Sequence, residues 1–212
     1  MTSDRRQQDR ELILRARDGD RQAFGDLVRH YQRRVYITAL QLTRNHSDAD
    51  DLTQETFVKA YRGLAGFDFR SDFFTWLYRI TVNTTLNLLN RAHRTRSVSL
   101  DDDALIPHAV DKLLAGSDDP RRRLEARNLY RKVTEAIDTL KPDLRVALVL
   151  YAIQGRSHKE IADIADCAEG TVAWRISEAR RLLRTKLSRA LRGERSPKDG
   201  LSRDEKEPFG LP

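Results

Sequence analysis

A regular set of aromatic, arginine and asparagine residues lies in the middle of the chain, in the segment DFFTWLYRITVNTTLNLLNRAHR (72–94). At about 100° per residue, six of these residues fall in one narrow stripe along a helix: Trp76, Arg79, Asn83, Asn87, Asn90 and Arg94. Amides supply donors and acceptors for base edges, guanidinium groups hold phosphates, and an indole ring can stack on a base. Because the other positions can mostly be buried, the stripe predicts a helix that holds unpaired DNA on its exposed side.

The segment before this helix, FDFRSDFF (67–74), adds four phenylalanines at positions 67, 69, 73 and 74. Aromatic rings on a loop can form the walls of a pocket for a base that has left the stack. Arg70 and Ser71 in the same loop are further candidate contacts to DNA. A second interpretation is that Phe67, Phe73 and Trp76 close the small hydrophobic core, although a stripe of asparagines has no such use.

Upstream, HSDADDLTQETFVKAYRGL (46–64) predicts a helix with an acidic beginning. One face collects residues that can be buried, namely Ala49, Leu52, Thr53, Thr56 and Ala60. Other residues remain available on the surface: Asp51, Gln54, Glu55, Val58 and Tyr61. A surface that mixes acids, an amide and apolar residues suits protein docking better than DNA binding. The alternative is a solvated face whose carboxylates favour the helix N-terminus.

The segment SHKEIADIADCAEGTVAWRISEARRLLRTKL (157–187) has the spacing of a helix-turn-helix motif. Ser157 followed by Glu160 is a capping box, which starts a helix. That helix carries Ile161, Ala162, Ile164 and Ala165 inward and lasts two turns before the turn DCAEG. A longer helix then begins near Glu169. This arrangement is the one that places a recognition helix in the major groove of duplex DNA.

On the second helix of this motif, we expect a buried stripe of Val172, Ile176, Ala179 and Leu183. The opposite side carries Ala173, Trp174, Ser177, Glu178, Arg181 and Arg184. Trp174 either packs on a neighbouring helix or a partner protein, or lies against the DNA backbone or a base edge. Basic residues along the helix can hold phosphates: Arg175, Arg180, Arg181, Arg184 and Lys186.

Helical periodicity without a strand pattern predicts an all-α chain of two small helical domains, at residues 11–96 and 121–192. The local signals expected at helix ends are Asp20, Ser47 and Ser71 as N-caps, Gly63 and Gly66 after a helix, and Pro142 at a helix start. Residues 1–10 and 193–212 are expected to be disordered. Residues 97–120 form a predicted flexible linker with six aspartates and one lysine, so the positive charge lies in the two domains.

A net charge of +7 and a pI near 9.7 favour nucleic-acid partners. The histidines are scattered, and Asp101–Asp103 lies in the linker without companion ligands, so we expect no metal or other cofactor and no enzyme. The single cysteine, Cys167, suits a reducing cytoplasm, and a small buried side chain is a better interpretation of it than a redox sensor. No signal peptide or membrane-spanning run is visible, which predicts a cytoplasmic protein without membrane insertion.

Taken together, the chain resembles bacterial RNA polymerase sigma factors, in particular the small two-domain extracytoplasmic-function group. The resemblance covers about residues 10–95 and 124–190. It rests on three segments in the same order: GDRQAFGDLVRHYQRRVYITALQLTRNHSDADDLTQETFVKAYRGL, FFTWLYRITVNTTLNLLNR and HKEIADIADCAEGTVAWRISEARRLL. Such proteins are promoter-specificity subunits that bind core polymerase and bring two DNA-binding modules to it.

The resemblance implies three interfaces. The helix 46–64 would bind the clamp helices of the largest polymerase subunit through Asp48, Asp51, Leu52, Gln54, Glu55, Phe57 and Val58. The next loop and helix would capture a flipped base of the minus-ten element through Phe67, Arg70, Ser71, Phe73, Trp76, Arg79, Asn83, Asn87, Asn90 and Arg94. The second domain would recognise the minus-thirty-five duplex through Ser157, His158, Lys159, Glu169, Gly170, Thr171, Ala173, Trp174, Arg175, Ser177, Glu178 and Arg181.

Further partners follow from the same resemblance. The second domain would contact the flap of the second-largest polymerase subunit, and the acidic linker would run toward the RNA exit path. An anti-sigma factor would hold the protein inactive by covering the docking helix and the recognition helix together. The chain departs from the family pattern at Phe69, where glycine is usual, and at Asn87, where aspartate is usual. Ala173, Trp174 and Glu178 also depart from it, so no promoter sequence can be transferred.

A different function remains open from the sequence: a stand-alone regulator that binds operator DNA through the helix-turn-helix, with the first half as a sensor or dimerisation domain. The asparagine-rich stripe distinguishes the two hypotheses, because a protein that binds only duplex DNA does not need it.

Overall fold

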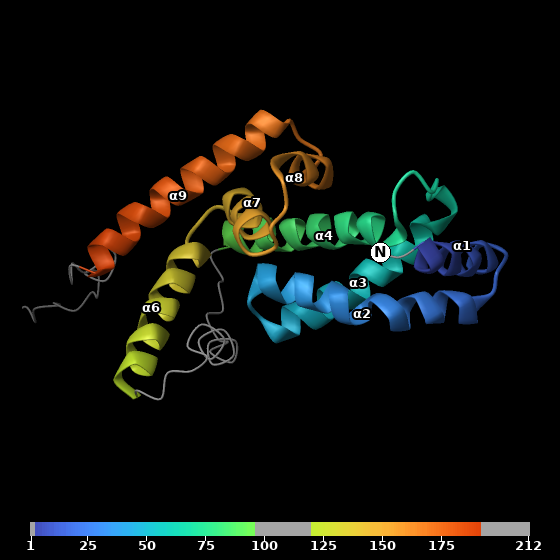
Figure 1. The fold of residues 1–212 in the computed structure, drawn as a ribbon, viewed down its shortest axis with the longest axis horizontal. Coiled ribbons are helices and arrows are strands. Elements are labelled where there is room, and N and C mark those ends of the chain that lie inside the picture. The colour runs from blue at the N-terminus through green and yellow to red at the C-terminus, as the bar shows by residue number, and fades with distance from the viewer. Residues whose placement is uncertain (1–2, 96–119, 192–212) are drawn as a thin grey trace, which may run out of the picture.

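The computed structural model describes residues 3–95 and 120–191, and all regular structure within them is helical (Figure 1). The first half contains α1 (Ser3–Arg17), α2 (Arg21–Thr43), α3 (His46–Gly63), the 3-10 helix η1 (Leu64–Gly66) and α4 (Phe73–Thr95). The second half contains α6 (Pro120–Asp138), α7 (Pro142–Ala152), α8 (His158–Ala165) and α9 (Glu169–Leu191). The expected all-α class with two small helical domains is confirmed. The acidic linker and the C-terminal tail lie outside the described residues, and the domain boundaries stay predictions.

Local capping signals explain several helix starts. The carboxylate of Asp20 accepts hydrogen bonds from the second and third residues of α2, as predicted. The prediction for Ser47 is wrong, because Asn45 caps α3 and accepts from the amide of its third residue at 2.8 Å. The prediction for Ser71 is also wrong, since its hydroxyl donates to the carbonyl of Asp72 at 3.4 Å instead of accepting from α4.

The N-terminal segment is helical from its third residue, so the expectation of disorder over the first ten residues is wrong for residues 3–10. The segment is polar, yet two long-range contacts order it. Asp9 is 2% exposed and accepts a hydrogen bond from the hydroxyl of Tyr31 in α2. Arg6 forms an ion pair of 2.6 Å with Asp72 in the loop before α4. These contacts hold α1 against the first domain.

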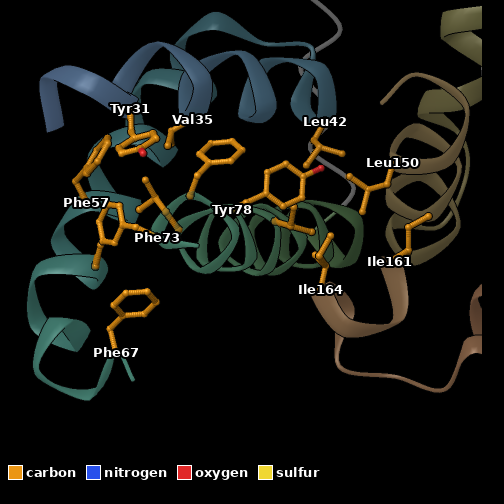
Figure 2. Close-up of a cluster of buried hydrophobic side chains, with 14 of the residues drawn as sticks. Tyr31, Val35, Leu42, Phe57, Phe67, Phe73, Tyr78, Leu150, Ile161 and Ile164 are labelled. Atoms are coloured by element: carbon orange, nitrogen blue, oxygen red, sulfur yellow. The ribbon is translucent and has the colours of Figure 1, made fainter. Parts of the chain in front are cut away.

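Helix α4 lies at the centre of the molecule, with α2 and α3 on one side and α7 and α8 on the other (Figure 1). Figure 2 shows one continuous apolar cluster from both halves: Tyr31, Val35, Leu42, Phe57, Phe73, Tyr78, Leu150, Ile161 and Ile164. None of these side chains is more than 7% exposed. Full burial of an apolar side chain of this size contributes about 1.5–3 kcal/mol. The two halves therefore share a core, which the sequence analysis does not predict.

Polar contacts reinforce the junction between the halves. Arg145 in α7 is 6% exposed, donates to the carbonyl of Thr43 at 3.0 Å and pairs with Asp138 at 2.9 Å. Arg44, which follows α2, also pairs with Asp138 at 2.5 Å. We call Arg44, Asp138 and Arg145 the polar clamp. Burial raises the pKa of Asp138 and lowers the pKa of Arg145, so both charges depend on each other for compensation.

Asp9 generates the first testable prediction. Burial raises the pKa of its carboxyl above the usual 3.8. Stability from this group is therefore fully present below pH 3.8 and is lost as the pH rises through the higher folded-state pKa. Asp9→Asn keeps an oxygen that can accept from Tyr31 but carries no charge. We expect this variant to be more stable than the wild type at pH 7, with a difference that shrinks toward pH 4.

Denaturant unfolding of both proteins between pH 7 and pH 4 measures this difference. Asp9→Ala is the control, and it should lose about 1–3 kcal/mol because the Tyr31 hydroxyl is left without its acceptor. A pH-independent difference between the wild type and Asp9→Asn would show that the carboxyl is not perturbed.

Candidate nucleic-acid interface

The asparagine-rich stripe of α4 faces solvent, as the helical wheel predicts. Arg79, Asn83 and Asn87 are exposed, and Asn90 is half-buried. The opposite side of α4 is part of the shared core. Arg94 belongs to α4, but its side chain lies outside the described part of the chain. The stripe therefore presents two exposed amides and a guanidinium group along one line of the helix.

The rings at the start of α4 form part of the core. Phe67 and Phe73 are 3% and 2% exposed, and Trp76 packs on both with ring centroids 5.2 and 5.6 Å apart. Phe74 is 8% exposed and lies under the guanidinium of Arg34. These contacts correct the expectation for Phe74. Phe67 and Phe73, although nearly buried, line a cavity of about 540 Å³ between α1 and the loop before α4, so their place in a base pocket stays a prediction. Core closure, the alternative interpretation, also describes the first two rings, and Trp76 is half-buried.

Sequence reasoning does not include α1 in the site, yet its arginines lie beside the loop 67–72. Arg17 donates from Nε to the carbonyl of Leu64 at 2.9 Å and from Nη2 to the carbonyl of Phe67. Arg70 and Ser71, both predicted contacts, are exposed on this loop. The arginines of α1 are visible in the sequence, but nothing local indicates which loop they meet.

Helix α3 presents the predicted docking surface only in part. Asp51, Gln54, Glu55 and Val58 are exposed, and Asp48 is half-buried. Burial, and then the charge of Asp51, raise the pKa of Asp48. Leu52 and Phe57 are 2% and 7% exposed, because both face neighbouring helices of the first half. We therefore reassign Leu52 and Phe57 from candidate contacts to core residues. The four exposed residues form a continuous surface of acids, an amide and an apolar side chain.

The helix-turn-helix has the predicted local geometry. Ser157 Oγ accepts from the amide of Glu160 at 3.2 Å, and the Glu160 carboxylate accepts from the amide of Ser157 at 2.9 Å. The capping box is confirmed. Ile161 and Ile164 of α8 are buried, and Asp166 turns the chain with φ of 50° before α9 begins at Glu169.

The remaining predicted contacts at the two helix starts have mixed exposure. Lys159, Glu169 and Gly170 are exposed, whereas His158 and Thr171 are half-buried. Three of these five residues are therefore open to a ligand in this conformation.

The outward side of α9 is exposed, with Trp174 at 62%. Ala173, Ser177 and Arg181 are also exposed, whereas the predicted inner stripe is buried except for the half-buried Leu183. Glu178 accepts two hydrogen bonds of 2.7 Å from Arg181, and these bonds lower the pKa of its carboxyl. Trp174 thus does not pack on a neighbouring helix of this chain.

Two arginines predicted to hold phosphates are engaged inside the second half. Arg175 pairs with Asp143 at 3.4 Å and approaches the sulfur of the half-buried Cys167 at 3.8 Å. Arg180 lies over the ring of Tyr151, with its guanidinium carbon 5.0 Å from the ring centroid. Their role with phosphates stays a prediction that requires these contacts to open.

The stripe of α4 and the helix-turn-helix border the same cleft, which lies between α4 and α8 and has a volume of about 510 Å³. Arg79 of the α4 stripe lines this cleft. Three carboxylates from the helix-turn-helix line it as well: Glu160, Asp163 and Asp166. Arg156 lines the same cleft and pairs with Glu160 at 2.8 Å, so the second half brings both charges to the cleft that contains Arg79.

Within residues 3–95 and 120–191 no group of histidines, cysteines or carboxylates could hold a metal ion. In the same ranges no helix is long and apolar enough to cross a membrane. The Asp101–Asp103 run lies outside the described residues.

Comparison with known proteins agrees with this arrangement. Two family profiles match: Sigma-70 region 2 over residues 27–95, and Sigma-70, region 4 over residues 130–183. The ECF RNA polymerase sigma-E factor of Haemophilus influenzae is 38% identical over 185 residues, which cover 84% of this chain and 95% of that protein. The RNA polymerase sigma-H factor of Pseudomonas aeruginosa is 35% identical over 187 residues, covering 88% and 97%.

Solved structures share the fold. CnrH in complex with the cytosolic domain of CnrY has a TM-score of 0.54 and 28% identity, covering 85% of this chain and 97% of that chain. The sigma factor RpoE in complex with the anti-sigma factor NepR from Bartonella quintana has a TM-score of 0.52 and 25% identity, covering 78% and 96%. Two helical modules of this kind define the sigma-70 class of transcription initiation factors. Within that class, the chain belongs to the ECF RNA polymerase sigma factors.

The exposure of Trp174 leads to a prediction. Trp174→Ala should change the free energy of unfolding by less than about 0.5 kcal/mol, because the side chain packs little. The variant should weaken binding of duplex promoter DNA by about 1–3 kcal/mol if the indole contacts a base edge. Ile176→Ala, two residues away and buried, is the matched control and should cost about 2–5 kcal/mol of stability. A large stability loss in Trp174→Ala would contradict the exposed placement.

Proposed function

We propose that this ECF sigma factor directs promoter-specific initiation through three separate surfaces. The exposed side of α3 binds core RNA polymerase, the stripe of α4 holds the melted minus-ten strand, and α9 recognises the minus-thirty-five duplex. The observation that carries the proposal is the exposed line of Arg79, Asn83 and Asn87 on α4, in the same chain as a helix-turn-helix.

Chemistry supports the division of work between α4 and α9. Amides and guanidinium groups on α4 can meet the base edges and phosphates of a single strand, whose bases are no longer paired. Helix α9 has the geometry of a recognition helix that enters the major groove with its N-terminal residues. A stand-alone operator-binding regulator, the alternative, would use α9 and leave the α4 stripe without a ligand.

In this structure α4 packs against α7 and α8, and we call this arrangement of the two halves the closed form. The closed form limits when both promoter elements can be bound. Elements centred near minus ten and minus thirty-five are about 25 base pairs apart, which is about 85 Å of B-form DNA. Helix α4 contacts α8, and α8 contacts α9, so two helix-packing distances of about 8–10 Å separate α4 from α9. We infer that the halves separate before the factor engages a promoter. The chain between Thr95 and Pro120 can reach about 80 Å when extended.

A partner that favours the closed form fits this scheme. CnrH and RpoE were each solved with a second protein, CnrY and the anti-sigma factor NepR. We propose that an anti-sigma factor covers the docking surface of α3 and the recognition helix α9 together. Affinity capture of the chain from its own cells tests this point, and recovery of polymerase without any dedicated inhibitor would contradict it.

Transcription in vitro with core polymerase and a genomic DNA library, followed by mapping of the start sites, tests the proposed function. We expect starts at a common set of promoters that core enzyme alone does not use. If the chain binds duplex DNA tightly without polymerase and gives no directed starts, the operator-binding alternative is correct.

Two double variants should separate the proposed activities. Asn83→Ala with Asn87→Ala should weaken capture of the melted strand about ten-fold or more, since each amide pair contributes about 1–3 kcal/mol. Its association with polymerase should be unchanged. Asp51→Ala with Gln54→Ala should instead weaken association with core polymerase by about 1–2 kcal/mol. Permanganate footprinting measures strand opening, and co-elution with core enzyme measures association. Equal losses of both activities in one variant would indicate a structural defect.

The polar clamp generates a further prediction. Asp138→Ala leaves Arg44 and Arg145 without their carboxylate, which should weaken the closed form by about 3–5 kcal/mol. We expect a larger radius of gyration by X-ray scattering, unchanged helical content by circular dichroism, and faster association with core polymerase. The control on the same helix is Glu135→Ala, whose exposed pair with Arg131 at 3.8 Å contributes little. An unchanged radius of gyration in Asp138→Ala would mean that the clamp does not hold the halves together.

A further inference from the structure

A charged pair lies on the outward side of α9, the second helix of the helix-turn-helix. The guanidinium of Arg181 donates two hydrogen bonds to the carboxylate of Glu178, from Nε to Oε2 and from Nη2 to Oε1, both at 2.7 Å. The side chain of Arg181 is 64% exposed, and that of Glu178 is 26% exposed. Because an exposed pair of this kind contributes little to stability, its main effect is on the orientation of Arg181.

The pair uses one edge of the guanidinium and leaves another edge open. Arginine has five N–H donors in a planar fork. Glu178 takes the donor on Nε and one of the two on Nη2. The second Nη2 donor and a donor of Nη1 then point away together from the end of the side chain. Two parallel donors of this kind match the O6 and N7 acceptors of guanine in the major groove.

The pair also holds the guanidinium toward the beginning of α9. Side chains of a helix lean toward its N-terminus, and Glu178 lies three residues before Arg181, over the preceding turn. Trp174 lies four residues before Glu178 and is 62% exposed. At about 100° per residue, Trp174, Ser177 and Arg181 fall within about 60° of one another, and all three are exposed. A duplex that meets Trp174 therefore also meets the open edge of Arg181.

Charge favours a base contact over a phosphate contact for this arginine. Phosphates attract side chains through their positive charge, and the carboxylate of Glu178 neutralises that charge beside Arg181. Arg184, which is also exposed on α9, suits a phosphate better. The pairing also makes the carboxylate of Glu178 tolerable close to a polyanion.

We propose that Glu178 is a positioning residue that sets Arg181 to read a guanine in the minus-thirty-five duplex. The inference rests on the proposed function of α9 and adds to it one base and the residue that reads that base. Glu178 then acts through Arg181, in place of the direct contact to DNA that the family resemblance implies. The minus-thirty-five elements of this factor share a G·C pair at the position that Arg181 meets.

The experiment uses holoenzyme assembled from core polymerase and the full chain, with one duplex promoter mapped in the transcription experiment. Each base pair of its minus-thirty-five element is replaced in turn, and the affinity of each fragment is compared with that of the unchanged promoter. For the wild type, we expect one G·C pair whose replacement weakens binding about ten-fold. Arg181→Lys keeps the charge but not the planar fork. It should lose the preference at that pair and keep the preferences elsewhere.

Variants of Glu178 separate positioning from direct contact. Glu178→Gln keeps the size of the side chain but has one acceptor oxygen instead of two, so it should reduce the preference at the same G·C pair about three-fold. In the Arg181→Lys background, Glu178→Gln should change nothing further at that pair, because its effect passes through Arg181. Arg184→Ala is the matched control on the same helix. It should weaken binding of all fragments alike and reduce the slope of log affinity against log salt by about one.

Several results would overturn the inference while leaving the proposed function intact. One is a wild-type profile without a sensitive G·C pair, and another is a wild-type profile in Arg181→Lys. An equal loss at every base pair in Glu178→Gln would indicate a structural effect. A changed preference at a different base pair in Glu178→Gln, kept in the Arg181→Lys background, would assign a direct contact to Glu178. If wild-type holoenzyme prefers no base pair of the element, the proposed function of α9 itself fails, and the inference with it.

Discussion

Both halves of the protein bury their apolar side chains against the same helix, and the rest of the structure depends on this sharing of α4. Helices α2 and α3 cover one side of it, and α7 and α8 cover another. Among the described side chains of α4, the stripe of Arg79, Asn83 and Asn87 is exposed on the side that these helices leave uncovered. Asparagine, a weak helix former, is tolerated there because packing on the other sides, rather than intrinsic propensity, stabilises the helix.

The same sharing connects the stripe of α4 with the helix-turn-helix, the two surfaces proposed to bind DNA. Carboxylates of α8 line the same cleft as Arg79, and Gln154, between α7 and α8, hydrogen-bonds to both Tyr78 and Gln41 of the first half. The polar clamp and the amides of Gln154 and Gln41 give the junction a defined geometry, since misaligned packing would leave buried polar groups without partners. The junction is therefore specific as well as apolar, which suits the reversible contact that the proposed function requires.

Local patterns predict much of this architecture, and long-range contacts account for what they miss. The capping box at Ser157 and the exposed stripe of α4 follow from spacing alone, because both involve residues within one or two helical turns. The order in α1 does not follow, since it depends on Asp9 meeting Tyr31, 22 residues away. The burial of Phe57 likewise depends on which helices come to cover it. Composition cannot distinguish an aromatic that lines a binding site from one that closes a core.

The apolar character of the shared core has a thermal consequence. Contacts of this kind weaken on cooling and are strengthened by moderate warming, because their hydration carries a large heat capacity. Detachment of α7 and α8 from α4 would expose Tyr78, Leu150 and Ile161 to water. Mild heat therefore strengthens the apolar part of the junction between the two halves, and cooling weakens it.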